Sequence, residues 1–238
     1  MSEEIYLLLI TAVSIGFIHT ILGPDHYIPF IVMSKAGKWS KFKTIWITVL
    51  SGTGHVLSSV LLGAIGIGFG VALHELEAIE SSRGEIAAWL MITFGLIYFI
   101  WGLKRAYKNK KHTHFHSDEN GVYHNLEHDH MGENTHVHKE EKSITKITPW
   151  IIFTIFVFGP CEALIPILMF PAANESTMGL LLVILTFGLS TILTMLAAVF
   201  IGITGFKIIP FKRYERYAHA MAGLLILLSG GAIRLLGL

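Results

Sequence analysis

The stretch His19-Thr-Ile-Leu-Gly-Pro-Asp-His26 decides how the rest of the chain is interpreted. It places two imidazoles and a carboxylate inside an otherwise apolar run from Ile5 to Met33. Ionisable side chains at membrane depth cost free energy, and by default they mark the path of an ion or substrate. Gly23 and Pro24 predict a helix break directly before Asp25, and such a break frees backbone carbonyls. The alternative is a loop with an incidental Asp-His after a shorter span.

The composition indicates a protein that crosses a membrane several times. The chain has 238 residues, 53% of them hydrophobic, and its mean hydropathy is +0.60. Lys+Arg and Asp+Glu nearly cancel at 18 and 17, so no basic surface points to a nucleic-acid partner. The start, Met-Ser-Glu-Glu, lacks the positive region and cleavage site of a signal peptide, so we expect the first span to be retained. Cys161 is the only cysteine, which excludes a two-cysteine relay within one chain.

Six apolar stretches are candidate spans, because the hydrocarbon core requires about 20 apolar residues. They cover residues 5–24 with a continuation to 33, 44–73, 86–103, 148–171, 178–205 and 217–237. The first, third and fifth connecting loops are rich in Lys and Arg, whereas the second loop, 74–85, is acidic. The positive-inside rule then predicts a plasma-membrane protein with both termini outside and the third loop in the cytoplasm.

A weak internal repeat divides the spans into two halves. Gly-Pro-Asp-His-Tyr-Ile-Pro at 23–29 matches Gly-Pro-Cys-Glu-Ala-Leu-Ile-Pro at 159–166, and four glycines of the third and sixth spans match at one offset. Three spans per half make the halves enter the membrane from opposite sides, as in many secondary transporters. We therefore expect an all-α membrane protein with six transmembrane helices in two inverted three-helix repeats, 1–107 and 147–238, joined by a loop at 108–146. The helices expected to break are the first and fourth, at Gly23, Pro24, Gly159 and Pro160. The alternative is that any two spans rich in Gly and Pro can be aligned.

Polar residues inside the predicted spans form a candidate metal site. They are His19, Asp25, His26, His55, Cys161 and Glu162. Imidazole with carboxylate suits divalent nickel, cobalt, zinc or copper. Cys161 and Glu162 occupy the repeat positions of Asp25 and His26, so a site between the halves could take ligands from both. For His55 a structural role and a ligand role are equally supported, and Cys161 could equally be a small packing residue.

The third loop is the second metal-binding signal. Eight of the thirteen histidines lie there, several as His-x-His pairs: His112, His114, His116, His124, His128, His130, His136 and His138. This composition is typical of metal capture, and it cannot build an apolar core, so we expect the loop to be largely disordered. The alternative is a merely solvated linker.

The chain resembles the nickel/cobalt transporter superfamily over essentially its whole length. His19 to His26 resembles that group's His-x4-Asp-His signature, Gly54-His55 looks like its Gly-His, and Pro160-Cys161 is similar to the Pro-Cys of its efflux members. The efflux members also carry a His-rich cytoplasmic loop between the third and fourth spans. The resemblance implies a six-span permease for divalent metal cations, with export the expected direction.

One departure from the family's pattern bears on this resemblance. Five residues rather than four separate His19 from Asp25, and one extra helical residue turns a side chain by about 100°, so the role of His19 stays open.

The Gly-Pro-Cys run also resembles thiol-electron carriers of cytochrome c maturation, but Asp25 stands where their first cysteine would be. Other relatives are sulfite or organic-anion exporters and urease accessory permeases. An anion would require fixed positive charge in the spans, which contain almost none before Arg234.

We expect a transporter rather than an enzyme, with nickel or cobalt as cargo, zinc as a further candidate, and no tightly bound cofactor. No nucleotide-binding motif is present in the sequence, so an ion gradient is the expected driving force. The expected partners are the lipid bilayer and the metal ion, and a homo-oligomer is left open. Two other classes are weighed: a zinc-dependent membrane hydrolase, and a metal sensor or scaffold that uses the His-rich loop alone.

Overall fold

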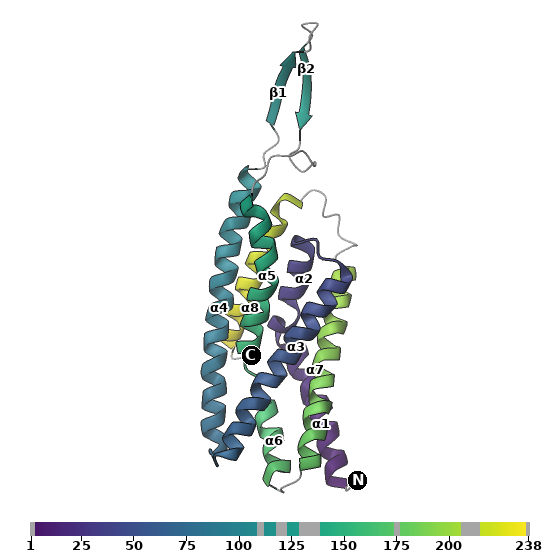
Figure 1. Cartoon of the computed structure of the whole chain (residues 1–238), viewed down its shortest axis with the longest axis vertical. Helices are drawn as coiled ribbons and strands as arrows, with labels where there is room; N and C mark the ends of the chain where they lie inside the picture. Colours follow the sequence, from purple (N-terminus) through teal and green to yellow (C-terminus); the bar gives the residue numbers. More distant parts are fainter. Residues whose placement is uncertain are drawn as a thin grey trace.

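The computed structural model is built from helices and one small hairpin (Figure 1). It describes residues 3–108, 112–117, 123–128, 139–173, 177–205 and 215–236. The elements are α1 (Glu3–Leu22), η1 (Pro24–His26), α2 (Ile28–Ala36), α3 (Lys41–Gly68), α4 (Leu73–Lys108), β1 (His112–Ser117), β2 (Tyr123–His128), α5 (Lys139–Phe158), α6 (Leu164–Ala173), α7 (Thr177–Gly205), η3 (Glu215–Tyr217) and α8 (Ala218–Leu236).

The expected class, a helical multi-pass membrane protein, is confirmed. Within the described ranges, five helices are long and apolar enough to cross a membrane: α1, α3, α4, α7 and α8. Many of their large apolar side chains are exposed on the outside of the bundle, as expected where lipid rather than water surrounds a protein. α5 contributes a shorter apolar stretch, Ile147–Phe158, and α6 contributes ten further residues.

Both predicted helix breaks are present. α1 ends at Leu22, and a single 3-10 turn separates it from α2. α5 ends at Phe158 and α6 begins at Leu164, so Gly159 and Pro160 lie in the second break. Proline explains both breaks, because it has no N–H and its ring collides with the carbonyl four residues earlier. Each break leaves backbone groups that other parts of the chain must satisfy.

The prediction of a loop at 74–85 is wrong. α4 begins at Leu73 and continues without interruption to Lys108. Leu76 is 1% exposed and Glu80 is fully buried, so one face of this segment packs inside the protein although its composition is acidic. Glu75, Glu77 and Glu85 are exposed on the outer face of the helix, and a loop prediction based on charge alone does not distinguish the two faces.

Part of the His-rich segment, which we expect to be largely disordered, is described as two short strands. β1 and β2 pair as an antiparallel hairpin, in which His112 lies opposite His128 and His116 opposite His124. The His-x-His pattern has a period of two, which is the period of a strand. His130, His136 and His138 lie outside the described residues. The hairpin lies beyond one end of the helical bundle (Figure 1).

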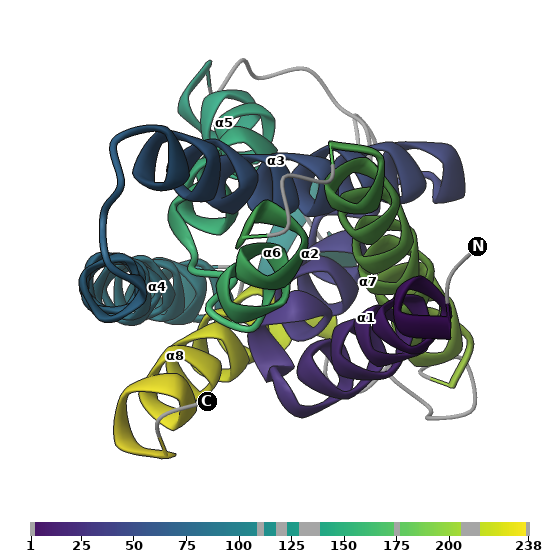
Figure 2. The same cartoon turned by 90° about the horizontal axis from the view of Figure 1, so that it is seen from below.

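Four helix pairs organise the bundle, and they are visible in the end-on view of Figure 2. α4 packs along α8, α1 packs along α7, and α3 packs against both α5 and α7. The short helices after the breaks fill the space between these pairs: α2 contacts α7 and α8, while α6 contacts α3 and α7. The protein interior therefore lies where the two broken helices meet the long ones.

Glycines bring the backbones of α4 and α8 into direct contact. A Cβ added at Gly95 would lie 2.8 Å from the Cα of Leu227 and 2.9 Å from the carbonyl oxygen of Gly223. A Cβ added at Gly223 would lie 2.6 Å from the Cα of Phe99 and 2.8 Å from the carbonyl oxygen of Gly95. Small residues at such crossings let membrane helices approach closely, which is the main source of their packing energy.

Replacement of Gly223 by alanine should therefore destabilise the protein. Its methyl group would collide with backbone atoms that cannot move aside, and overpacking of this kind costs about 1–3 kcal/mol. The matched control is Gly231→Ala on the same helix, where an added Cβ meets nothing within 4 Å. Thermal unfolding in detergent should show a lower Tm for Gly223→Ala and an unchanged Tm for Gly231→Ala. Equal Tm values for the two variants would contradict the close contact of α4 and α8.

Candidate metal centre

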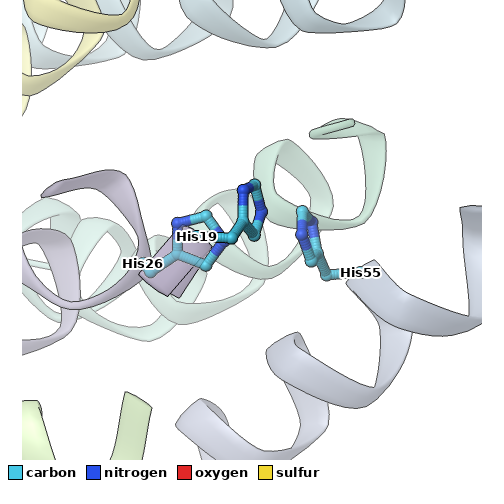
Figure 3. A group of neighbouring side chains, drawn as sticks. All are labelled: His19, His26 and His55. Carbon is cyan, nitrogen blue, oxygen red and sulfur yellow. The ribbon is translucent and has the colours of Figure 1, made fainter. Parts of the chain in front are cut away.

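Three histidines from three different elements converge in the protein interior (Figure 3). His19 comes from the last turn of α1, His26 from η1 and His55 from the middle of α3. One ring nitrogen of each lies within 4.8 Å of those of the other two. Their ring centroids are 4.8 Å apart for His19 and His26, and 5.1 Å apart for His26 and His55.

The break after α1 brings His19 and His26 together. On a continuous helix His19 and Asp25, six positions apart, would point in different directions, but α1 ends at Leu22 and the 3-10 turn that follows brings His26 back toward His19. Gly23 is required at this turn, because an added Cβ would lie 2.5 Å from the Nδ1 atom of His26 and 2.9 Å from an Asp25 oxygen. The structure therefore places His19 in the cluster.

Two acceptors hold the outer nitrogens of the cluster. Asp25 Oδ1 lies 3.0 Å from Nδ1 of His26, and the carbonyl oxygen of Phe156 lies 3.3 Å from Nδ1 of His55. The Phe156 carbonyl accepts the N–H of Gly159 at 3.1 Å, and its second lone pair can face His55 because the residue four positions later, Pro160, has no N–H. When Nδ1 donates to these oxygens, the Nε2 atoms of His26 and His55 keep their lone pairs, as in the histidine ligands of metal sites.

The Nε2 atoms of all three histidines are buried, and no described residue forms a hydrogen bond with any of them. Buried polar atoms are normally partnered. His219, another buried histidine of this chain, follows that rule: Nδ1 lies 2.7 Å from the Tyr98 hydroxyl and Nε2 lies 2.7 Å from Arg105. The contrast makes the three Nε2 atoms of the cluster candidate ligands for a cation.

The arrangement fits a borderline divalent cation. Imidazole nitrogen is the ligand preferred by nickel, cobalt, zinc and copper. Metal–nitrogen bonds of about 2.0–2.1 Å imply nitrogens about 3.4 Å apart in a tetrahedral site. In the structure one ring nitrogen of each histidine lies within 4.8 Å of those of the other two, so the three would have to move closer together to bind one ion.

The other predicted site residues do not join the three nitrogens. Asp25 contacts the far nitrogen of His26 rather than the centre of the cluster. Cys161 is fully buried in an apolar group that includes Leu164, which matches the packing role weighed for it. Glu162 is exposed. The structure thus brings together His19, His26 and His55, and gives Asp25 an orienting contact.

An ion pair that sequence reasoning missed supports the second break. Glu80 is fully buried and pairs with Arg83 one helical turn later. The second carboxylate oxygen of Glu80 accepts the backbone N–H of Cys161 at 3.2 Å, and the hydroxyl oxygen of Ser59 lies at the same distance from that N–H. The signal available in the sequence was the Glu-x-x-Arg spacing on a helical face, which the acidic composition of the segment obscured.

Arg83 binds the other side of the same break. Its Nη2 donates to the hydroxyl of Ser58 at 2.8 Å, to the carbonyl of Val157 at 3.2 Å and to that of Gly159 at 3.5 Å. A Cβ added at Gly159 would lie 3.4 Å from Nδ1 of His55, so this break lies directly beside the cluster. The ion pair therefore fixes the segment that presents the Phe156 carbonyl to His55.

Comparisons of the chain with family models, curated proteins and solved structures found no match.

Replacement of Glu80 by alanine should loosen the second break. Removal of one partner of a buried ion pair typically costs about 3–5 kcal/mol, because the other charge is left uncompensated. We expect a lower Tm in detergent, and the buried thiol of Cys161 should become reactive toward a maleimide. The control is Glu85→Ala, which removes an exposed carboxylate 3.6 Å from Arg234 and should have little effect. An unreactive Cys161 and an unchanged Tm in Glu80→Ala would rule out the supporting role.

Proposed function

We propose that the chain is a membrane transporter of divalent transition-metal cations, with nickel and cobalt as the expected cargo and export as the expected direction. The observation that carries this proposal is the convergence of three histidines whose Nε2 atoms are buried and unpartnered among the described residues, with one ring nitrogen of each within 4.8 Å of those of the other two. The helix break that forms half of the cluster supports a transport role, because transporters place their ion sites on broken helices. The resemblance of the same residues to the nickel/cobalt superfamily supports the choice of metal.

The packing of the helices supports six spans in two inverted repeats. Counted as single broken helices, α1 with α2 and α5 with α6 complete a set of six with α3, α4, α7 and α8. Exchange of the two halves turns the α1–α7 pair into the α5–α3 pair, and both pairs are present. The same exchange turns the contact of Gly95 with Leu227 into that of Gly223 with Phe99, and both contacts are present. A two-fold relation in the membrane plane accounts for these correspondences.

The charge of the site suits transport rather than permanent storage. Three neutral imidazoles bind the cation directly, and the one carboxylate, Asp25, acts through His26. The ion therefore keeps most of its positive charge in the site. Transport requires binding that is favourable enough for entry and weak enough for release. A gradient of protons or other ions would drive the cycle.

The hairpin supports capture of the cation before it enters the bundle. His112, His114 and His116 occupy alternate positions of β1, and the residues opposite them are His128, Leu126 and His124. Directly opposed residues belong to one face of a two-stranded sheet, so five histidines are assigned to a single face. The lysines and arginines of the first, third and fifth loops predict that the hairpin lies on the cytoplasmic side of the membrane.

A zinc-dependent hydrolase is the second candidate, because three histidine ligands with an open fourth position also suit catalytic zinc. Stoichiometric zinc that survives dialysis, together with lipid hydrolysis, would favour it, whereas readily exchanged metal favours transport. An anion exporter has less support, since Arg83 at the second break is already paired with Glu80.

Replacement of His26 or His55 by alanine should abolish cobalt flux into or out of sealed proteoliposomes. Asp25→Asn should weaken metal binding by about 10–100-fold, the usual effect of changing a residue that orients a histidine ligand. The control is His74→Ala, an exposed histidine outside the cluster, which should leave flux and affinity unchanged. Calorimetric titration with cobalt and nickel gives the affinities. Undiminished flux in both His26→Ala and His55→Ala would refute the proposed site.

The hairpin should affect capture rather than the maximum rate. Conversion of His112, His116, His124 and His128 to asparagine should raise the metal concentration that gives half-maximal flux. The maximal flux should stay unchanged, because the site in the membrane is intact. A control with Thr113, Phe115, Asn125 and Glu127 changed to serine alters the opposite face of the same strands. Complete loss of flux in the histidine variant would instead indicate a scaffold that works through the loop alone.

A further inference from the structure

Three buried hydroxyl groups differ from the other hydroxyls of the helices. In an apolar helix a Ser or Thr hydroxyl normally donates to the carbonyl oxygen one turn earlier. The hydroxyls that do so here include those of Thr11, Thr20, Thr44, Ser82, Thr154, Thr204 and Ser229. Among the described residues, Thr48, Ser51 and Thr191 have buried hydroxyl oxygens with no hydrogen-bond partner at all.

Two of these hydroxyls continue the line of the His cluster along α3. Thr48, Ser51 and His55 are spaced three and four residues apart, so they share one face of the helix. Thr48 and Ser51 are fully buried and His55 is 1% exposed, so this face is directed into the protein. A rise of 1.5 Å per residue puts Thr48 about 10 Å from His55 along the helix, in the direction of Lys41.

The third hydroxyl lies beside the cluster on α7. A Cβ added at Gly52 would lie 3.1 Å from Ile192, and one added at Gly188 would lie 3.5 Å from Val56, so this part of α7 runs alongside the His55 turn of α3. The Oγ1 atom of Thr191 lies 3.3 Å from the position of a Cβ at Gly16, one turn before His19. Thr191 therefore lies at about the same depth in the helical bundle as the His cluster.

The hydroxyls on the far side of His55 behave differently. The Ser59 oxygen faces the N–H of Cys161, and the Ser58 oxygen accepts from Arg83 while its own hydroxyl donates to the carbonyl of His55. The α3 hydroxyls next to the cluster on its Glu80 side, Ser58 and Ser59, are therefore partnered. Thr48 and Ser51, the nearest buried α3 hydroxyls on its Lys41 side, have no partner among the described residues, whereas Thr44, one turn further on, bonds to the carbonyl of Ser40. The cluster thus has one satisfied side and one side with hydroxyl oxygens available as ligands.

We propose that the hydroxyls of Thr48, Ser51 and Thr191 line a hydrated path that carries the cation between the His cluster and the Lys41 end of α3. An unsatisfied buried hydroxyl costs about 1–3 kcal/mol, and water or a passing cation removes that cost. Neutral hydroxyl oxygens bind a cation weakly, so it can advance to the stronger imidazole ligands or leave them. The identity of the cargo in this proposal rests on the proposed function, whereas the presence of water does not.

Cysteine accessibility tests the path, and the single native cysteine simplifies the experiment. In a Cys161→Ala background that retains cobalt flux, Thr48→Cys and Ser51→Cys are treated with a charged, membrane-impermeant thiol reagent in proteoliposomes that expose the Lys41 end. The matched control is Leu50→Cys, because Leu50 is 43% exposed on the outer surface of the same helix, where lipid suppresses thiolate formation. Ser58→Cys tests the closed side.

We expect Thr48→Cys and Ser51→Cys to react about tenfold faster than Leu50→Cys, and cobalt to slow the reaction. Ser58→Cys should react as slowly as Leu50→Cys. Rates for Thr48→Cys and Ser51→Cys equal to that of Leu50→Cys would overturn the path, and fast reaction without protection by cobalt would overturn its role for the cation. As a second measurement, Thr48→Val and Ser51→Ala should lower cobalt flux severalfold, whereas Thr204→Val, whose hydroxyl already bonds to Phe200, should not.

Parallel measurement of cobalt flux separates the two proposals. Normal flux with unreactive cysteines would reject the hydrated path and leave the transporter proposal intact. Reactive cysteines in a protein that carries neither cobalt nor nickel would reject the transporter proposal and retain a water-filled path. Loss of cobalt protection in His26→Ala, with fast labelling preserved, would connect the path to the cluster.

Discussion

A helix inside a membrane must satisfy its own backbone hydrogen bonds, and this chain interrupts that pattern twice with proline. Every feature of the candidate site follows from the two interruptions. The break after Leu22 folds His26 back against His19. The break after Phe158 leaves the Phe156 carbonyl available for His55. The exposed backbone groups of the second break are then bound by Glu80 and Arg83, so the cost of the interruption is offset by side chains from a third helix.

The two sides of the His cluster differ in their hydrogen bonding. On one side, the ion pair and the serines Ser58 and Ser59 satisfy the second break. On the other side, the buried hydroxyls of Thr48 and Ser51 on α3 have no partner among the described residues. The transport cycle that we propose would require such a difference, because only one side of an ion site can be open at a time.

Much of the fold could be predicted from the sequence, because hydropathy and proline act locally. The bounds of α7 and α8 and both breaks follow from apolar length and from Gly-Pro pairs. The helical start of α4 could not be predicted, since its acidic residues resemble a loop until the burial of Glu80 is known. The site was predicted in part: residue types identified His26 and His55, but the approach of His19 depends on the turn at Gly23. The contact of Asp25 with His26 could not be predicted either, because it depends on where the turn places the two side chains.

The central claim is that His19, His26 and His55 bind one transition-metal ion inside the membrane. X-ray absorption at the cobalt edge tests it most directly, with the full-length chain in which the eight loop histidines are replaced by asparagine. If the three histidines bind one cobalt ion, the spectrum should show about three imidazole nitrogens at about 2.0–2.1 Å from the metal, by analogy with other histidine sites. That signal should disappear in the same protein with His55→Ala. A first shell of oxygen alone, or an unchanged spectrum without His55, would contradict the account.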